Sequence, residues 1–332
     1  ENQFLRLELN NAGEIIRLYD KRFDREVIAD GQTANQFQLF QDGPEHEAAW
    51  NVHVTFEKRR YNVEGKTTLE VMENGPVRGI IRMIKNHRNS RFMQDIVMYE
   101  NSPRIDFVTK AHWQERQVML KIAFPVEIMA DNATYEIQFG ALQRTTHKNT
   151  SWDQEKFEVA AHRWVDISEA GYGVSLLNDC KYGHDIKGNI LRLTALRGTE
   201  FPDRNADIGQ HEFTYSLLPH KGDWHEGETV RRAYELNVPL ICRQGGVSKG
   251  ESPAEQSFLK IQGPAMLETL KPAEDGKGVI LRLYEPNGGR GKVTVILSKK
   301  LRNLKDCNLV EEDKGNIGFE GNSFSFTVHP FE

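Results

Sequence analysis

The chain has 332 residues, 27% of them charged, and a formal net charge of −5. This length can bury a sizeable core and suffices for one large and one small domain. Charges of the two signs are nearly balanced and form no long block of one sign, which excludes the electrostatic footprint of a nucleic-acid-binding protein.

The cysteine pattern and the absence of targeting signals indicate a reduced compartment. No apolar run has the length of a membrane helix, and no signal-peptide pattern is present. The three cysteines, Cys180, Cys242 and Cys307, are odd in number and form no CxxC pair. We therefore expect a cytoplasmic protein with no membrane partner and no nucleic-acid partner. Because the chain begins at Glu1 and enters strand-like alternation at once, we also expect it to be a piece of a longer protein.

Alternation of apolar and polar residues with a period of two dominates the chain and predicts half-buried strands. In chain order, clear runs lie at 5–9, 52–56, 93–99, 213–217 and 324–328. Glycine- and asparagine-containing turn signals separate such runs, at 11–13, 74–76, 169–171 and 287–289. No stretch combines sustained helical periodicity with capping residues. The sequence therefore predicts an all-β fold built from long antiparallel sheets.

A change of composition divides the chain near its last quarter. Residues 243–255 are polar, rich in glycine and serine, and include Pro253. Shorter strands are expected beyond them, at 258–261, 278–284, 292–297 and 323–328. This pattern predicts a large β domain over residues 1–245 and a small β-sandwich over residues 246–332.

The stretch from Leu176 to Trp224 concentrates side chains that could carry chemistry. It contains Asp179, His184, Asp185, Asp203, Asp207, His211 and Glu212. Asp207 and His211 are four residues apart, so on a strand they share a face and could bind one cation. Gly209 lies between them, however, and zinc sites seldom consist of carboxylates with so few His or Cys ligands. We favour a loop-to-strand corner in which His211 and Glu212 hydrogen-bond the backbone, and we expect no metal site in this chain.

Two histidine-containing segments have competing interpretations. His184 and Asp185 lie between Gly183 and Gly188, and a His–Asp pair could orient a general base. Neighbouring strand residues point to opposite faces, however, so we favour a solvated turn. The segment His162, Arg163 and Trp164 suits sugar binding, and it equally suits a packed strand with a partly buried arginine. For this segment the sequence does not decide between sugar binding and a packed strand. None of the common nucleophile, zinc or nucleotide-binding motifs is present in the sequence.

Several long segments resemble the C-terminal region of glycoside hydrolase family 38 α-mannosidases, in their cytosolic, neutral branch. The segments are 138–198, which includes "QRTTHKNTSWDQ", and 202–224, "PDRNADIGQHEFTYSLLPHKGDW". Residues 1–21 and 268–295 support the same resemblance. It implies a mutarotase-like supersandwich followed by a small terminal β-sandwich. It also implies that N-terminal α/β and helical domains, absent from this chain, carry the nucleophile, the acid catalyst and the metal ligands.

The resemblance implies a function for the full-length protein, which is retaining, metal-dependent hydrolysis of α-mannosides. Zinc or cobalt is expected in the missing catalytic domain, and neither a cofactor nor a catalytic residue is expected in this chain. Its partners would be a mannose-containing oligosaccharide and its own catalytic domain, and the resemblance allows a homo-oligomer. The isolated chain is expected to be inactive and to form part of the wall of the sugar cleft.

The resemblance also nominates residues for the cleft or the domain interface. Arg197 aligns with an arginine segment that reaches the cleft in the family, and replacing it by alanine is expected to weaken catalysis without disturbing the fold. Loops 179–187 and 197–207 are expected to lie side by side, facing the catalytic domain. Ala141 stands where close relatives usually carry His, and Asn51 where they commonly carry Asp. The complete set of candidates is Arg197, Asp179, His184, Asp185, Asp203, Asp207, His211, His162 and Arg163.

Two alternative functions remain. The chain could be a free-standing carbohydrate-binding or structural β-sandwich protein. It could also be an aldose epimerase, which has a similar fold and uses a His and a Glu as its acid–base pair, here His162 or His211 with Glu212. An upstream α/β domain with zinc-type ligands would decide for the mannosidase.

Overall fold

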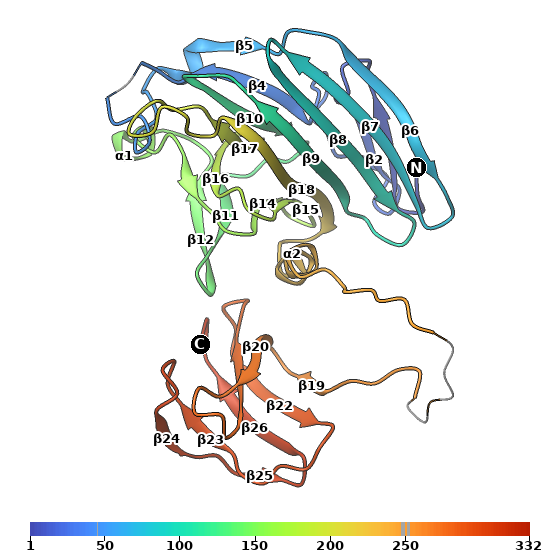
Figure 1. Cartoon of the computed structure of the whole chain (residues 1–332), viewed down its shortest axis with the longest axis vertical. Helices are drawn as coiled ribbons and strands as arrows, with labels where there is room; N and C mark the ends of the chain where they lie inside the picture. The colour runs from blue at the N-terminus through green and yellow to red at the C-terminus, as the bar shows by residue number, and fades with distance from the viewer. Residues whose placement is uncertain (45, 247–249, 251–252) are drawn as a thin grey trace. The chain divides into compact units, whose positions relative to one another are not determined.

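The computed structural model describes residues 1–44, 46–246, 250 and 253–332. These residues form two compact units. The large unit comprises Glu1–Ile137 and Leu142–Pro239, and the small unit comprises Gln138–Ala141 and Leu240–Glu332. Nearly all regular structure in both is β-strand, which confirms the predicted all-β fold (Figure 1). Within the described residues, no helix has the length and apolarity needed to cross a membrane.

Two extended antiparallel sheets and a small one build the large unit. The six-stranded sheet has the order β13 (Val159–Ala160), β16 (Gly183–Lys187), β17 (Ile190–Arg197), β10 (Val118–Pro125), β4 (Gln36–Gln41), β5 (Arg60–Asn62). The nine-stranded sheet has the order β12 (Gly140–Thr145), β11 (Asn132–Ile137), β14 (Trp164–Glu169), β15 (Tyr172–Asn178), β18 (Gly209–Lys221), β9 (Ile105–Trp113), β8 (Ser90–Tyr99), β7 (Arg78–His87), β6 (Thr67–Asn74). The three-stranded sheet consists of β1 (Leu5–Leu9), β2 (Ile15–Asp20) and β3 (Arg25–Glu26).

The main core lies between the six-stranded and the nine-stranded sheet. Phe124 of β10 meets Phe107 of β9 and Tyr215 of β18, with ring centroids 5.7 and 6.0 Å apart. Phe37 of β4 packs edge-on against Phe92 of β8 at 5.2 Å. Such edge-on and offset pairs add to the free energy gained by burying apolar area. Strands on both sheets alternate between this core and an outer face, as period-two sequences require.

A β-bulge in β17 decides which of its residues face outward. Leu120 of β10 pairs with Leu196, but the next residue, Lys121, pairs with Thr194, so Ala195 is the extra residue. Ala195 and Leu196 are consequently both buried in the main core. A bulge shifts the alternation by one residue. Arg197 therefore points to the outer face of the six-stranded sheet, where regular alternation would have placed it in the core.

The segment 52–56 departs from its predicted strand. It has no regular strand structure before η1 (Phe56–Arg59), a short 3₁₀-helix. Phe56 is buried and packs against Phe40 and Met119 on the outer face of the six-stranded sheet, with Val52 at the edge of the cluster. The apolar residues of this segment thus cover a sheet from outside instead of adding a strand to it.

Helical structure is sparse, and the sequence did not predict it. α1 (Ser151–Gln154) is a single turn whose first residues are capped by the Thr150 hydroxyl. α2 (Thr229–Asn237) is the longer helix, and it buries Val230 and Ala233. Glu228 precedes α2 in the left-handed conformation and gives it no side-chain cap, so the usual start signal of a helix is missing.

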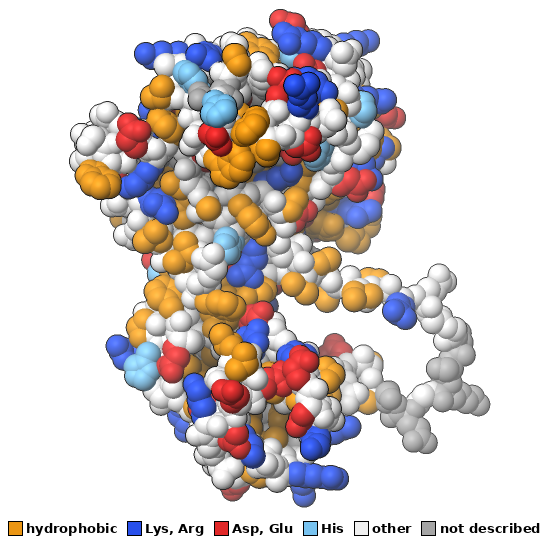
Figure 2. All heavy atoms as spheres, turned by 60° about the vertical axis from the view of Figure 1, so that its left-hand side comes forward, with side chains coloured by type: hydrophobic (Ala, Val, Ile, Leu, Met, Phe, Trp, Pro, Cys, Tyr) orange, Lys and Arg blue, Asp and Glu red, His pale blue; other side chains and the backbone are white. Residues whose placement is uncertain are grey.

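One end of the nine-stranded sheet is an exposed edge strand. β6 pairs with β7 on one side and ends the sheet on the other (Figure 1). Most of its side chains are exposed, including Leu69, Val71 and Met72. Over the visible face of the protein, charges of both signs are interspersed, as the balanced composition predicts (Figure 2).

The small unit is built from short strands around its own core. Its sheets are β19 (Leu259–Gln262), β22 (Gly291–Leu297), β26 (Ser323–Val328) and β25 (Phe319–Glu320); β20 (Met266–Pro272) with β21 (Val279–Tyr284); and β23 (Lys305–Cys307) with β24 (Asp313–Asn316). Val293, Val295 and Phe324 form the centre of its core. Strands were predicted at the positions of β19, β21, β22 and β26, whereas β20, β23, β24 and β25 were not predicted.

Candidate functional site

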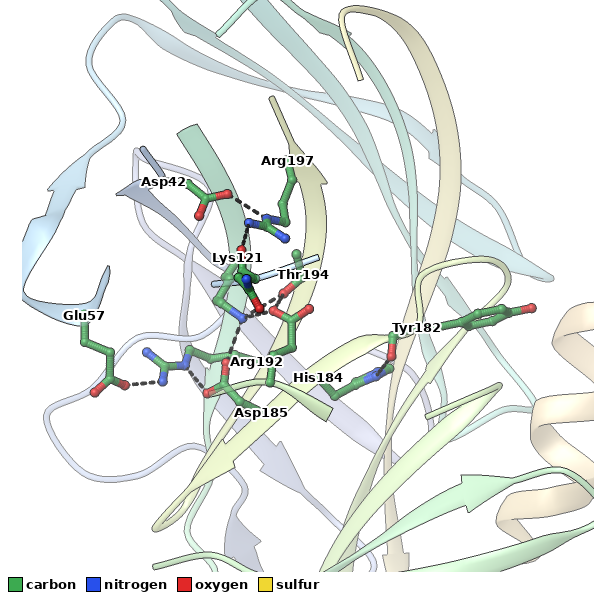
Figure 3. Close-up of polar contacts among 11 residues, drawn as sticks. Asp42, Glu57, Lys121, Tyr182, His184, Asp185, Arg192, Thr194 and Arg197 are labelled. Carbon is green, nitrogen blue, oxygen red and sulfur yellow. Dashed lines mark hydrogen bonds and ion pairs between the residues drawn. The ribbon is translucent and has the colours of Figure 1, made fainter. Parts of the chain in front are cut away.

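A buried lysine lies at the centre of the polar groups on the outer face of the six-stranded sheet (Figure 3). Lys121 of β10 is fully buried, and its Nζ lies 2.6 Å from Glu158 Oε2 and 2.9 Å from Asp185 Oδ2. It also donates a hydrogen bond of 2.7 Å to Thr194 Oγ1. Burial by itself would lower the pKa of Lys121, but Asp185 and Glu158 outweigh it and raise the pKa. The lysine is therefore held as an ammonium ion between two carboxylates.

Further ion pairs extend this cluster toward the surface. Arg192 Nε donates to Asp185 Oδ1 at 2.5 Å, and its terminal nitrogen donates to Glu57 Oε1 at 2.5 Å (Figure 3). Lys187 Nζ contacts Glu57 Oε2 at 2.8 Å. Burial tends to raise the pKa of Glu57, but hydrogen bonds from Arg192 and Lys187 lower it to about 2. We call the six side chains Lys187, Glu57, Arg192, Asp185, Lys121 and Glu158 the ion array.

A glycine leaves the space that the Glu158 carboxylate of the ion array occupies. Gly183 of β16 pairs with Thr194 of β17. A Cβ atom at Gly183 would lie 2.2 Å from Glu158 Oε1 and 3.1 Å from Thr194 Cβ. Any larger residue would displace the carboxylate that neutralises Lys121. Gly183, which was expected to flank a solvated turn, is therefore needed for a close approach between side chain and backbone.

Arg197 lies at the end of β17 and is largely buried. Its Nε donates to Asp42 Oδ2 at 2.6 Å, and its terminal nitrogen donates to the carbonyls of Ala48 and Asn51 at 2.9 and 2.8 Å. Only 17% of the side chain is exposed, and Asp42 is buried. The prediction that Arg197 lies on a loop is therefore wrong, because it is the last residue of β17. Its burial also argues against the expectation that its replacement would leave the fold undisturbed, whereas its role at the sugar cleft stays a prediction. Arg197 ties the segment 42–51 to the sheet, and its contact with residue 51 uses the backbone, so it does not depend on which side chain stands there.

His184 is a buried residue of β16, so the predicted solvated turn is also wrong. Its exposed fraction is 0%, and its Nδ1 lies 3.2 Å from the Tyr182 carbonyl oxygen. Burial lowers the pKa of His184 to about 4. Asp185 contacts Lys121 and Arg192, so the two neighbours do not form a His–Asp pair. The alternation within a strand accounts for this separation.

The corner predicted around His211 and Glu212 is present in part, because the His211 side chain contacts the backbone as expected and the Glu212 side chain contacts Lys110. His211 Nε2 lies 2.7 Å from the Asp207 carbonyl oxygen, and Asp207 Oδ2 accepts a hydrogen bond from the Arg197 backbone. Glu212 contacts Lys110 at 2.7 Å instead of sharing a site with the histidine. Asp203 accepts from the Asn205 backbone within the same connection. These contacts organise a turn, and they place no acid–base pair of the epimerase type at His211 and Glu212.

The two segments expected to lie side by side are partly strand. Residues 183–187 form β16, and only 179–182 connect it to β15. Asp179 accepts from the backbone of Thr214 and thereby lies beside β18. Gly183 pairs with Thr194, so the 179–182 connection and the 198–207 connection leave the six-stranded sheet at the same end.

The segment His162 to Trp164 is packed. The backbone and the guanidinium of Arg163 both donate hydrogen bonds to the Glu136 carboxylate, and the guanidinium lies 3.8 Å from the ring centre of Tyr234. Trp164 is fully buried and packs against Trp224 with ring centroids 5.0 Å apart. His162 lies 5.4 Å from the Tyr182 ring. Of the two readings left open by the sequence, the geometry matches the packed strand.

Another buried polar cluster combines the residue types of a hydrolytic triad without its geometry. His220 Nε2 lies 2.7 Å from Asp166 Oδ2 and 3.1 Å from Ser175 Oγ. In a catalytic triad, serine and aspartate contact different ring nitrogens, whereas here they share one. Ser175 also contacts Thr229 Oγ1 of α2 at 2.7 Å, and all four residues are buried. The cluster fastens α2 to the sheet.

Sequence reasoning missed most of the ion array. Lys121 is the one charge in the buried strand "VMLKIAFP", and this interruption of an apolar run was the available signal. Its partners Glu158 and Asp185 come from other segments and carry no such signal. Within the described residues, no three His, Cys, Asp or Glu side chains are grouped so that they could hold a metal ion. The described residues of this chain therefore do not supply the ligands of the zinc or cobalt site expected for the resembling family.

Comparisons with known proteins agree with this architecture. The family 38 C-terminal domain of the glycosyl hydrolases matches residues 1–205, and the C-terminal β-sandwich domain of the same family matches residues 265–332. Human α-mannosidase 2C1 is 40% identical over the whole chain, and α-mannosidase G of Dictyostelium discoideum is 34% identical. The chain spans about a third of these relatives, 32% of each.

The fold likewise matches solved structures. An α-mannosidase from Enterococcus faecalis superposes with a TM-score of 0.78 at 15% identity, covering 100% of this chain and 41% of that one. A second family 38 protein from the same organism gives a TM-score of 0.76 at 14% identity, with 98% and 43% covered. The two family models together match residues 1–205 and 265–332, which is most of the chain. The chain therefore belongs to glycoside hydrolase family 38, as a C-terminal β region of that family.

Proposed function

We propose that the chain is the C-terminal part of a retaining, metal-dependent α-mannosidase and that it braces one wall of the sugar cleft. Similarity to proteins named α-mannosidases over the full chain, at 40 and 34% identity, supports the activity. The observation that carries the bracing role is the arrangement of Arg197, which binds Asp42, Ala48 and Asn51 at once.

A retaining glycosidase needs two carboxyl groups about 5–5.5 Å apart, one to attack the anomeric carbon and one to protonate the leaving oxygen. The buried carboxylates of the ion array are unsuited to these tasks, because each is already paired with lysine or arginine. We assign both catalytic carboxylates, together with the zinc or cobalt ligands, to a catalytic domain of the full-length protein. A metal bound there would stabilise negative charge on sugar hydroxyls.

The chain's own residues position the segments around them. Arg197 is a positioning residue, because it contacts a neighbouring segment and a buried carboxylate and has little exposed surface left for substrate. The ion array fixes β10, β16 and β17 against the covering segment that contains Glu57. Rigid support of this kind keeps groups in a cleft within the narrow tolerances that catalysis requires.

Location and partners are part of the same proposal. In the described part of the chain, Cys180, Cys242 and Cys307 are free thiols, and the first two are exposed. Exposed thiols persist where the environment is reducing, which supports the cytoplasm. The substrate would be a mannose-containing oligosaccharide, and the closest partner would be the protein's own catalytic domain.

The test compares the 332-residue chain with the full-length protein on a chromogenic α-mannoside. We expect no turnover by the chain alone. The full-length protein should hydrolyse the substrate, and zinc or cobalt should restore its activity after chelation. Metal-dependent turnover by the purified chain would show that the catalytic groups lie within it and would overturn the assignment.

A further inference from the structure

Two asparagine–glycine pairs of the chain lie in connections between strands, and they differ in one hydrogen bond. Asn74 and Gly75 lead from β6 to β7, and Asn287 and Gly288 lie between β21 and β22. Both asparagines are exposed. The Gly75 N–H donates to the Arg78 carbonyl at 3.0 Å, whereas the Gly288 N–H has no acceptor among the described residues. The backbone nitrogen of Gly288 is therefore available for a reaction in the folded chain, and that of Gly75 is engaged.

A backbone nitrogen that follows asparagine can attack the asparagine side chain. The nitrogen of Gly288 would bond to Cγ of Asn287, its proton would pass to the departing amide, and ammonia would leave as a cyclic succinimide closes. Water then opens the ring to aspartate or isoaspartate, so the net reaction consumes one water and releases one ammonia. Glycine suits this attack because it has no Cβ in the way. A nitrogen whose N–H is already bonded must first give up that bond.

A buried carboxylate binds the loop on both sides of the bond between Asn287 and Gly288. Glu285 is fully buried; its Oε1 accepts from the Asn287 N–H and its Oε2 from the Gly289 N–H, each at 2.9 Å. The same Oε2 accepts from the Phe331 N–H at 3.2 Å. Within the described residues no cation pairs with Glu285, so these backbone donors compensate the burial of its charge. The distance between the amides of residues 287 and 289 therefore matters for the stability of the small unit.

Isoaspartate at position 287 would disturb this arrangement in two ways. Its main chain runs through the former side chain, which inserts one methylene group between the Cα of residue 287 and the nitrogen of residue 288. The two amides that Glu285 binds lie on opposite sides of the insertion, so they would no longer fit both carboxylate oxygens at once. The free carboxylate of isoaspartate would also add a negative charge close to the buried one, and like charges repel.

We propose that Asn287 is a site of spontaneous deamidation, and that its conversion to isoaspartate releases the loop from Glu285 and loosens the small unit. Water is the one co-reactant. Asn74 belongs to the same dipeptide and is protected in the folded chain by the hydrogen bond of Gly75. This modification lies within the small unit and does not depend on the activity proposed above.

The test is incubation of the 332-residue chain in mildly alkaline buffer, followed by tryptic digestion and mass spectrometry. Trypsin releases Asn74 in peptide 67–78 and Asn287 in peptide 283–290, and each peptide contains a single asparagine. In the folded chain we expect Asn287 to convert about tenfold faster than Asn74, because attack at Asn74 first requires the hydrogen bond of Gly75 to break. In concentrated urea this bond is lost, so the two rates should approach each other.

Two variants separate this modification from general ageing of the sample. Asn287→Gln should stay intact, because the longer side chain would have to close a larger and less favourable ring. Asn74→Gln is the matched control and should leave conversion at position 287 unchanged. After the same incubation, trypsin should cut at Arg282 in β21 and Lys292 in β22 several-fold faster in the parent and in Asn74→Gln than in Asn287→Gln.

Three results would overturn the proposal. The first is conversion of Asn287 no faster than that of Asn74 in the folded chain. The second is a ratio of the two rates that urea leaves unchanged, since the hydrogen bond of Gly75 would then not be the cause. The third is an incubated parent that contains isoaspartate in peptide 283–290 and yet resists trypsin within the small unit as well as incubated Asn287→Gln does.

Discussion

At the scale of single residues, the main result is that a charged side chain, Lys121, lies within the otherwise apolar strand β10. All eight residues of β10 are buried, and Lys121 is the charged one among them. A buried ammonium ion is tolerated when carboxylates surround it with good geometry, and removing one partner is far more costly than the net gain from the pair. The sequence shows the lysine, but its partners come from strands whose order the sequence does not reveal.

Arg197 and Asp42 give a quantitative expectation at this scale. Arg197→Ala leaves the buried Asp42 carboxylate without its partner, so the free energy of unfolding should fall by about 2–4 kcal/mol. All five tryptophans lie in the large unit, so urea unfolding followed by tryptophan fluorescence reports on it specifically. The matched control is Arg231→Ala, which breaks an exposed pair with Glu235 on α2 and should cost less than about 0.5 kcal/mol. Equal effects of the two variants would show that Arg197 has no structural role.

The buried His184 predicts how the free energy of unfolding depends on pH. An unfolded histidine titrates near pH 6.5, whereas burial lowers the pKa of His184 to about 4 in the folded chain. Between these values the unfolded state binds more protons, so the stability present above pH 6.5 is progressively lost as the pH falls to 4, by about 3 kcal/mol at most. Urea unfolding at several pH values should show this slope in the parent and a flatter one in His184→Asn. Glu57, with its pKa lowered to about 2, acts in a lower window, between pH 4.5 and 2.

At the scale of elements, alternation predicted most strands but could not reveal irregularities. The run at 52–56 alternates as a strand does, yet its apolar residues cover the outer face of a sheet, because Phe56 finds Phe40 and Met119 there. The bulge in β17 is equally invisible in the sequence, although it alone turns Arg197 outward. Both features depend on contacts between distant segments, and a local pattern carries no information about them.

Gly183 tests the packing between β16 and the ion array. A methyl group added there would meet the Glu158 carboxylate at 2.2 Å, so Gly183→Ala should lower the free energy of unfolding by about 1–3 kcal/mol. Gly79→Ala on β7 is the control, since its Cβ would have its nearest neighbour at 3.8 Å. In a Glu158→Ala background most of the cost should disappear, because the methyl group then has space. Tryptophan-detected urea unfolding measures all four variants, and an unchanged cost in that background would contradict the explanation.

At the scale of the whole molecule, composition predicts a domain boundary, and the described chain forms two units with Gln138–Ala141 assigned to the small one. The large unit ends at Pro239, and no regular strand is described before β19 begins at Leu259. The predicted boundary, 245/246, lies between these positions. Turn-forming and polar residues mark where strands cease, but they do not say which neighbouring residues belong to which core.

Limited proteolysis checks this division. Arg243 is exposed and follows the last residue of the large unit by a few positions. We expect trypsin at low concentration to cut first after Arg243 and to leave fragments 1–243 and 244–332, identified by mass. Arg243→Gln should slow this first cut. Early cleavage inside β18 or β22 would instead show that the units are less stable than the segment between them.

The exposed edge at β6 has a practical consequence for work with this chain. Its outer row of backbone donors and acceptors, with Val71 and Met72 beside it, can pair with the same row of another copy. Such pairing requires two molecules to meet, so its rate grows with the square of the concentration. Doubling the concentration of a stock solution would therefore halve the time in which a given fraction of the molecules pairs, even under conditions in which each molecule remains fully folded.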